Sequence, residues 1–335
     1  MIKFQEKPNL FNAKLTAIWA VSESGLGGLL HAIKIPFSGL FLGSFAVIII
    51  TYLAYVNTNK FSAIIKATLL VILIKATVSP HSPPMAYIAV LFQGVVGASF
   101  YGAFGVNKLT AISFGSIALF ESAFQKIFTL TIIFGTGLWE SIKQFFTGIQ
   151  SKLQMDWISD LPWLFLSIYG LLYFIVGIIA GNLSAKLPKI VFENAKSLGK
   201  IDVRIPNETI SLKKNKKKRL WLIGGLLIFS ILVFVFSGAF NNALYIVLRT
   251  LGAIIFFLFV FNPLFKFLMQ KWVEKKKNSN NKSLKTIIEL MPSIRNNVGI
   301  AHQLSSSEKN LWKRGKSFTT NWLSLSLYYE DESHE

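Results

Sequence analysis

The chain repeats one pattern that decides what it can fold into: long apolar runs, each about as long as a membrane is thick, separated by shorter polar segments. A helix needs about 20 mostly apolar residues to cross the hydrocarbon core of a bilayer. Because backbone polar groups in lipid must be paired within the protein, these runs predict helices. The sequence therefore predicts an all-α integral membrane protein with about eight transmembrane helices, at Leu15–Ile33, Pro36–Val56, Phe61–Val78, Pro84–Phe104, Leu109–Gly135, Leu161–Ala185, Leu220–Phe236 and Ala243–Leu264.

The distribution of Lys and Arg predicts the orientation. If the N-terminus lies inside the cell and all eight runs cross, 28 of the 35 basic residues fall in inner segments and 3 in outer segments. Basic residues are enriched in the cytoplasmic loops of membrane proteins, so this bias predicts a multi-pass protein of the cell (cytoplasmic) membrane with both ends inside. Loss of one run upstream of residue 185 would destroy the bias, whereas loss of two would keep it. An even number of spans is therefore better supported than the number eight.

Polar segments divide the chain into five parts. The tail repeats apolar residues at near-helical spacing between Leu284 and Val298, which predicts an amphipathic helix. Alternation of polar and apolar residues over 201–212 is typical of a short hairpin. The expected parts are a cytoplasmic lead (1–14), a six-helix membrane domain (15–185), a basic cytoplasmic loop (186–219), a two-helix membrane hairpin (220–270) and a basic cytoplasmic tail (271–335).

Charge and composition narrow the function classes. The net charge of +19 arises between the apolar runs, which favours anchoring at anionic lipid over nucleic-acid binding. The chain has no cysteine, which removes disulfides, thiolate metal sites and cysteine nucleophiles. Walker A, HExxH and GxSxG motifs are absent as well. We therefore expect a protein that is not an enzyme and needs no cofactor.

A few polar residues in or near the spans are candidate ligand-binding groups. Glu23 lies within the first span, where a carboxylate is costly; it either binds a cationic ligand or proton, or fixes helix packing. Glu121 has Lys126 nearby, which favours a packed pair. His31 and Lys34 lie at the outer end of the first span, and His81 lies in the outer loop SPHSPP.

These outer groups are expected to hold a polar organic ligand. Two histidines and Glu23 are also a donor set for a divalent metal, and simple solvation of the histidines is the remaining alternative. The third outer segment, 136–160, carries Trp139 and Trp157 and is expected to form an amphipathic helix on the outer surface.

The first six spans resemble the substrate-binding S components of energy-coupling factor (ECF) transporters. The resemblance rests on a six-helix unit with short outer loops and on the glycine-rich stretches SGLGGLLHAIKIPFSG and SPHSPPMAYIAVLFQGVVGAS. It implies a ligand site near the outer face, under three loops that here carry His31, Lys34, His81 and Trp157. It also implies that the small residues Thr16, Ala20, Ser24 and Gly28 pack against a transmembrane partner subunit; packing within the chain is the alternative.

The chain departs from that family after residue 185. Two further spans and a basic tail follow, and the family's Ala-Arg-Gly coupling motifs are replaced at best by Lys313-Arg314-Gly315. We expect the protein to be a membrane transport component that is energised by a separate cytoplasmic ATPase. It would capture a small solute, either a compound similar to a vitamin precursor or a metal. The alternatives are a membrane scaffold whose tail binds a partner and a membrane-embedded enzyme acting on a lipid.

Overall fold

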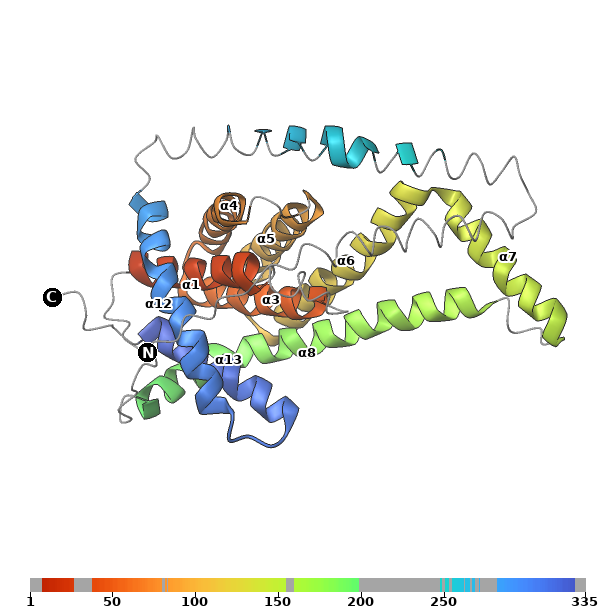
Figure 1. Ribbon diagram of the computed structural model, residues 1–335. Helices are drawn as coiled ribbons and strands as arrows, with labels where there is room; N and C mark the ends of the chain where they lie inside the picture. Colours follow the sequence, from red (N-terminus) through yellow and green to blue (C-terminus); the bar gives the residue numbers. More distant parts are fainter. Residues whose placement is uncertain are drawn as a thin grey trace. The chain divides into compact units, whose positions relative to one another are not determined.

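The computed structural model describes residues 8–26, 38–79, 82, 84–154, 160–198, 248, 251–252, 255–261, 263–265, 267–268, 271 and 282–328. Every regular element in these residues is a helix, which confirms the predicted all-α class (Figure 1). The expected hairpin at 201–212 and the span Leu220–Phe236 lie outside the described residues. Only short helical pieces of Ala243–Leu264 are described, among them the π-helical segment η3 (Phe256–Phe261).

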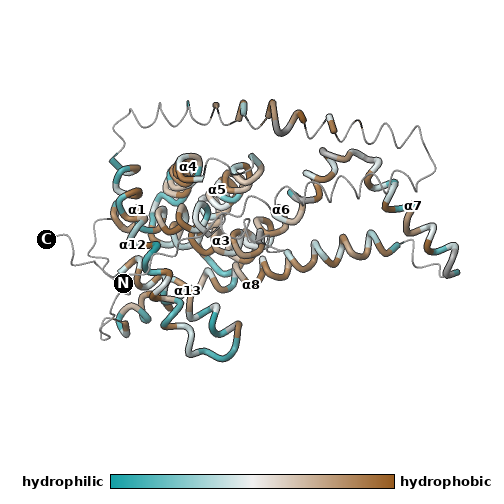
Figure 2. The backbone as a smooth tube through the Cα atoms, viewed as in Figure 1, coloured by the Kyte–Doolittle hydropathy of each residue, from teal (hydrophilic) through white to brown (hydrophobic). Residues whose placement is uncertain are grey.

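The chain is a multi-pass membrane protein by the length and composition of its helices. Four described helices are long and apolar enough to cross a bilayer: α3 (Ser38–Val56), α4 (Lys60–Val78), α5 (Pro84–Phe104) and α8 (Leu161–Leu198). The bent pair of α6 (Lys108–Phe134) and α7 (Thr136–Leu153) is a candidate for a fifth span. Figure 2 shows the apolar character of these helices and the hydrophilic residues scattered through the C-terminal ones.

The observed helices begin within two residues of the expected starts, except at the first span. There the helix α1 already begins at Pro8, ends at Val21 and continues as the π-helical turn η1 (Ser22–Leu26). The residues before Leu15 are helical because their polar groups find partners inside the protein. Asn12 exchanges side-chain hydrogen bonds of 2.8 Å with Asn57, and the Lys14 ammonium donates to the Leu327 carbonyl at 3.0 Å.

The chain divides into two compact units, each described by itself. Unit 1 comprises Met1–Lys126, Trp163–Arg204 and Asn262–Glu335; unit 2 comprises Ile127–Pro162 and Ile205–Phe261. Unit 2 contains α7, the helix expected in the third outer segment. Its apolar residues recur at helical spacing, and the Trp139 indole donates to the Thr131 hydroxyl at 3.0 Å. The expected amphipathic helix is confirmed, whereas its position on the outer surface stays a prediction.

In unit 1, α1 lies among α3, α4 and the two tail helices, and α5 packs on both α3 and α4 (Figure 1). Glycines allow two of the close crossings. A Cβ on Gly94 of α5 would overlap the Thr68 side chain of α4. A Cβ on Gly177 of α8 would lie 2.6 Å from the Gly115 carbonyl oxygen of α6. Gly177 and Gly181 are spaced as in membrane helix pairs whose backbones touch.

The tail folds back onto the first unit as two helices, α12 (Lys282–Ser305) and α13 (Leu311–Tyr328). The amphipathic helix expected from Leu284 is confirmed as α12, which buries Leu284, Ile287, Met291 and Ile294. The sequence reasoning missed α13, whose end is buried from Thr320 to Leu327. Its Trp322 ring stacks on Phe45 of α3 and donates to the Ile294 carbonyl of α12 at 3.0 Å.

Candidate functional site

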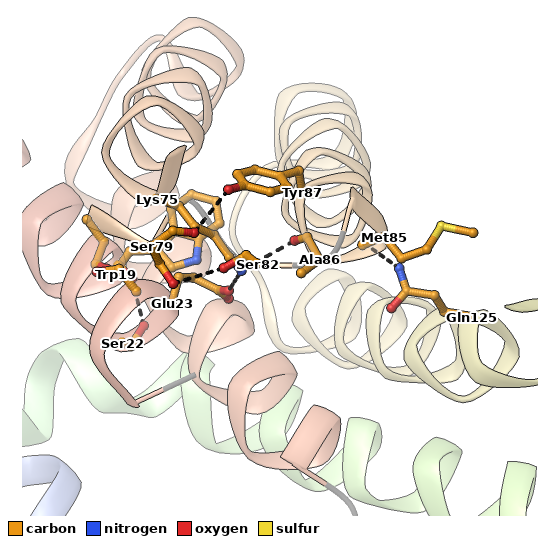
Figure 3. Close-up of polar contacts among 12 residues, drawn as sticks. Trp19, Ser22, Glu23, Lys75, Ser79, Ser82, Met85, Ala86, Tyr87 and Gln125 are labelled. Carbon is orange, nitrogen blue, oxygen red and sulfur yellow. Dashed lines mark hydrogen bonds and ion pairs between the residues drawn. The ribbon is translucent and has the colours of Figure 1, made fainter. Parts of the chain in front are cut away.

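A buried ion pair joins the end of the first helical segment to the end of α4. The Lys75 ammonium lies 2.7 Å from a carboxylate oxygen of Glu23, and the two side chains are 5% and 6% exposed, respectively. Lys75 also makes a longer contact of 3.4 Å with the Ala86 carbonyl at the start of α5 (Figure 3). Three elements that are apart in the sequence therefore meet at one charged site.

The backbone around Glu23 departs from α-helical geometry. Glu23 lies in the π-helical turn η1, and single π turns inside helices occur frequently at functional sites. The hydroxyls of Ser22 and Ser24 donate to the carbonyls of Trp19 and Ala20, at 2.7 and 2.5 Å. Serines that bond to the preceding turn loosen a helix locally. The Ser-Glu-Ser sequence thus explains why the turn changes at the carboxylate.

Ser79, Ser82 and Tyr87, at the end of α4 and the start of α5, form hydrogen bonds close to the ion pair. The Tyr87 hydroxyl donates to the Ser79 carbonyl at 3.3 Å, and the Ser82 hydroxyl donates to that of Ser79 at 3.0 Å. The Lys75 ammonium lies 5.9 Å from the centre of the Tyr87 ring, so the aromatic face adds a weak attraction for the cation. Helix α4 ends at Val78 and α5 begins at Pro84, where a proline fits the first turn.

A second group of polar side chains lies on α5 and α6. The Gln125 amide donates to the Met85 carbonyl at 2.6 Å. One oxygen of Glu121 and the amide oxygen of Gln93 are buried without a hydrogen-bond partner among the described residues. Gln93 faces Gly43 of α3, because a Cβ on that glycine would lie 3.6 Å from the Gln93 amide nitrogen. Buried polar atoms are usually hydrogen-bonded. The unpaired oxygens of Glu121 and Gln93 are therefore exceptions, and they lie in a part of the helix bundle that contains several polar side chains.

Of the five predicted site residues, the structure describes one. Glu23 lies in the charged site, whereas His31, Lys34, His81 and Trp157 lie outside the described residues. The metal hypothesis depended on those histidines; the described residues contain no group of three His, Cys, Asp or Glu that could hold a metal ion. The structure describes no side chain for Lys126, the expected partner of Glu121.

Lys75 lies inside the expected span Phe61–Val78 but was not among the predicted site residues. The available signal was its position in the apolar stretch VILIKATV, because a lysine there needs a partner. The structure also shows what the small residues of the first helix contact. Thr16, Ala20 and Ser24 are buried against the chain's own helices, so they are not free to pack on a partner subunit.

No family model, no curated protein and no solved structure matches this chain. The functional argument therefore rests on the site itself.

Proposed function

We propose that this protein is a membrane transport component that captures a small solute from the outer face of the cell membrane. The solute is either a compound similar to a vitamin precursor or a metal ion. A separate cytoplasmic ATPase and a transmembrane partner subunit would supply the energy. The observation that carries the proposal is the buried Glu23–Lys75 pair at a π-helical turn. Charges buried within membrane helices are costly and are retained mainly where they serve function.

The proposed topology puts this pair near the outer face. With both ends inside, α4 runs outward and α5 returns, so Lys75 and Ala86 lie close to the outer loop. The contacts of the tail support a topology in which both ends of the chain lie on the same side of the membrane. Lys14, Tyr52 and Asn194 belong to the halves of α1, α3 and α8 that this topology places inside, and all three hydrogen-bond to α13. The proposed eight spans are an even number and therefore return the chain to the inner side.

One alternative is a scaffold whose tail binds a cytoplasmic partner. The outward faces of α12 and α13 favour it, because Lys285, Arg295 and Lys313 are exposed there. A scaffold has no need for a buried ion pair at the opposite end of the spans, which is why transport is the better-supported function. A lipid-modifying enzyme is the weaker alternative, since the hydroxyls of Ser22, Ser24 and Ser82 donate to Trp19, Ala20 and Ser79 and not to the Glu23 carboxylate that would have to activate them.

Ligand-dependent thermal stability tests the proposal. The full chain in lipid nanodiscs would be screened against a library of small polar solutes and divalent metals, and at least one should raise the unfolding temperature. Glu23→Gln and Lys75→Met should abolish that rise. Lys66→Met is the matched control, because Lys66 lies on the same helix with an exposed side chain. A scaffold would show no stabilising solute, and the two site variants would then behave like the control toward every compound.

A further inference from the structure

We infer that the Glu23–Lys75 site takes a small zwitterion, an amino acid with its ammonium and carboxylate close together. This inference rests on the proposed function and names its substrate class. The site supplies one negative and one positive charge, 2.7 Å apart and nearly inaccessible to water. A ligand that carries the same two charges in the opposite order completes an alternating arrangement of four charges.

Both partners retain hydrogen-bonding capacity for such a ligand. Within the described part of the chain, only one of the two Glu23 oxygens accepts a hydrogen bond. The Lys75 ammonium has three donors; one bonds Glu23, and a second makes the long 3.4 Å contact with the Ala86 carbonyl. A ligand ammonium can bind the free Glu23 oxygen while a ligand carboxylate binds the remaining Lys75 donor. The existing ion pair need not break.

Charge balance selects against ligands with one charge. The described pair is neutral as a unit, so a bound amine or carboxylic acid anion would leave one net charge in a site with little water. An uncompensated buried charge is strongly unfavourable, on the order of a hundredfold or more in affinity. A zwitterion adds no net charge and pairs each of its groups. The short distance between the two protein charges favours amino acids whose two groups are separated by one or two carbons.

The test compares each zwitterion with its two single-charge relatives. Binding of β-alanine, glycine and the common α-amino acids to the full chain in nanodiscs would be measured by calorimetry. Each would be compared with the amine that lacks the carboxylate and the acid that lacks the ammonium; β-alanine is paired with ethylamine and propionate. At least one amino acid should bind, and both relatives should bind at least a hundredfold more weakly.

The variants should change selectivity in opposite directions. Glu23→Gln leaves a positive site and should shift preference toward the acid, whereas Lys75→Met leaves a negative site and should shift it toward the amine. Lys66→Met should keep the wild-type order. Equal binding of a zwitterion and a single-charge relative to the wild-type protein would overturn the inference, and this comparison needs no variant to fold.

Failure of this inference is distinguishable from failure of the proposed function. If no amino acid binds but another solute class stabilises the protein in a Glu23-dependent way, the zwitterion is wrong and solute capture stands. If no compound in either panel binds, both are wrong.

Discussion

At the scale of single residues, the buried polar side chains of the first unit fall into two groups. Thr51 and Tyr101 are paired, with 2.6 Å between their hydroxyl oxygens, and Glu23 is paired with Lys75. The Gln93 amide oxygen has no partner among the described residues, although the side chain is almost completely buried. Paired groups stabilise the helix bundle, whereas an unpaired amide lowers its stability. A side chain retained at that cost is a candidate for contact with a solute.

Gln93→Leu should therefore stabilise the protein. The change removes an amide oxygen that is buried without a partner among the described residues, which should raise the free energy of unfolding by about 1–2 kcal/mol. Gln125→Leu is the matched control of opposite sign, because it removes the side-chain hydrogen bond to the Met85 carbonyl and should cost about 1 kcal/mol. Denaturant unfolding in nanodiscs measures both. A loss of stability in both variants would show that the Gln93 amide is bonded in the folded protein.

At the scale of helices, glycine positions determine how closely the spans approach. Gly177 and Gly181 of α8 face the backbone of α6 between Ala111 and Ser116, so these helices touch through main-chain atoms. Such contacts depend on the absence of a side chain, since membrane helices gain little from hydrophobic burial against one another. The hydropathy pattern predicted both helices. It did not predict this crossing, because nothing in a single sequence says which spans become neighbours.

Gly177→Ala should separate α6 from α8. The added methyl group would meet the Gly115 carbonyl and the Ser116 backbone, neither of which can move as a side chain can. Overpacking of this kind costs about 1–3 kcal/mol. Gly148→Ala in α7 is the control, because nothing lies within 4 Å of its new methyl group. The two thermal unfolding temperatures should differ clearly, and equal values would mean that α6 and α8 do not cross at these glycines.

The helix α13 shows where helix prediction from the sequence fails. Its end, NWLSLSLY, alternates leucine and serine from Leu323 to Leu327, a spacing that is typical of a strand. The segment is helical because it is surrounded: Ser324 donates to the Val191 carbonyl at 2.9 Å, and Asn194 donates to Asn321 at 2.9 Å. Tertiary contacts thus override the local pattern. The buried polar face could be recognised only after α1, α8 and α12 were in place.

Trp322→Ala should release α13 from the spans. The change removes a fully buried ring that packs on Phe45 and Phe318, and loss of such a ring costs about 3–5 kcal/mol. Trypsin should then cleave after Lys316 several times faster than in the unchanged protein. Leu311→Ala serves as the control, since that side chain is 84% exposed on the same helix. Cleavage at the unchanged rate would indicate that α13 is held mainly by its polar contacts.

At the scale of the whole molecule, the sequence predicted the helical, multi-pass class of the protein and the starts of the described spans better than the helix ends or the site. Apolar length and charge bias are properties of segments, so they located α3 to α6 and the start of α8. The helix ends depended on pairing across the fold: α8 continues past Lys186 to Leu198 because Asn194 contacts the tail, and α1 starts at Pro8 because Lys14 does. Glu23 was recognisable by itself, whereas its partner Lys75 required the structure.

The proposed topology places both ends of the chain on one side of the membrane, and the absence of native cysteine makes this proposal directly testable. Single cysteines would be placed at exposed positions and probed in intact cells with a membrane-impermeant maleimide. Cysteines replacing Thr58, Asn107 and Ser306 should be protected, and those replacing Ser151 and Asp160 should react. Permeabilised cells give the control, in which all five should react. If the cysteine at 306 alone changed sides, an odd number of crossings would lie between α8 and α12. The hydrogen bond from Lys14 to Leu327 would then be impossible in the membrane, because a helix cannot pack on residues that the bilayer separates from it.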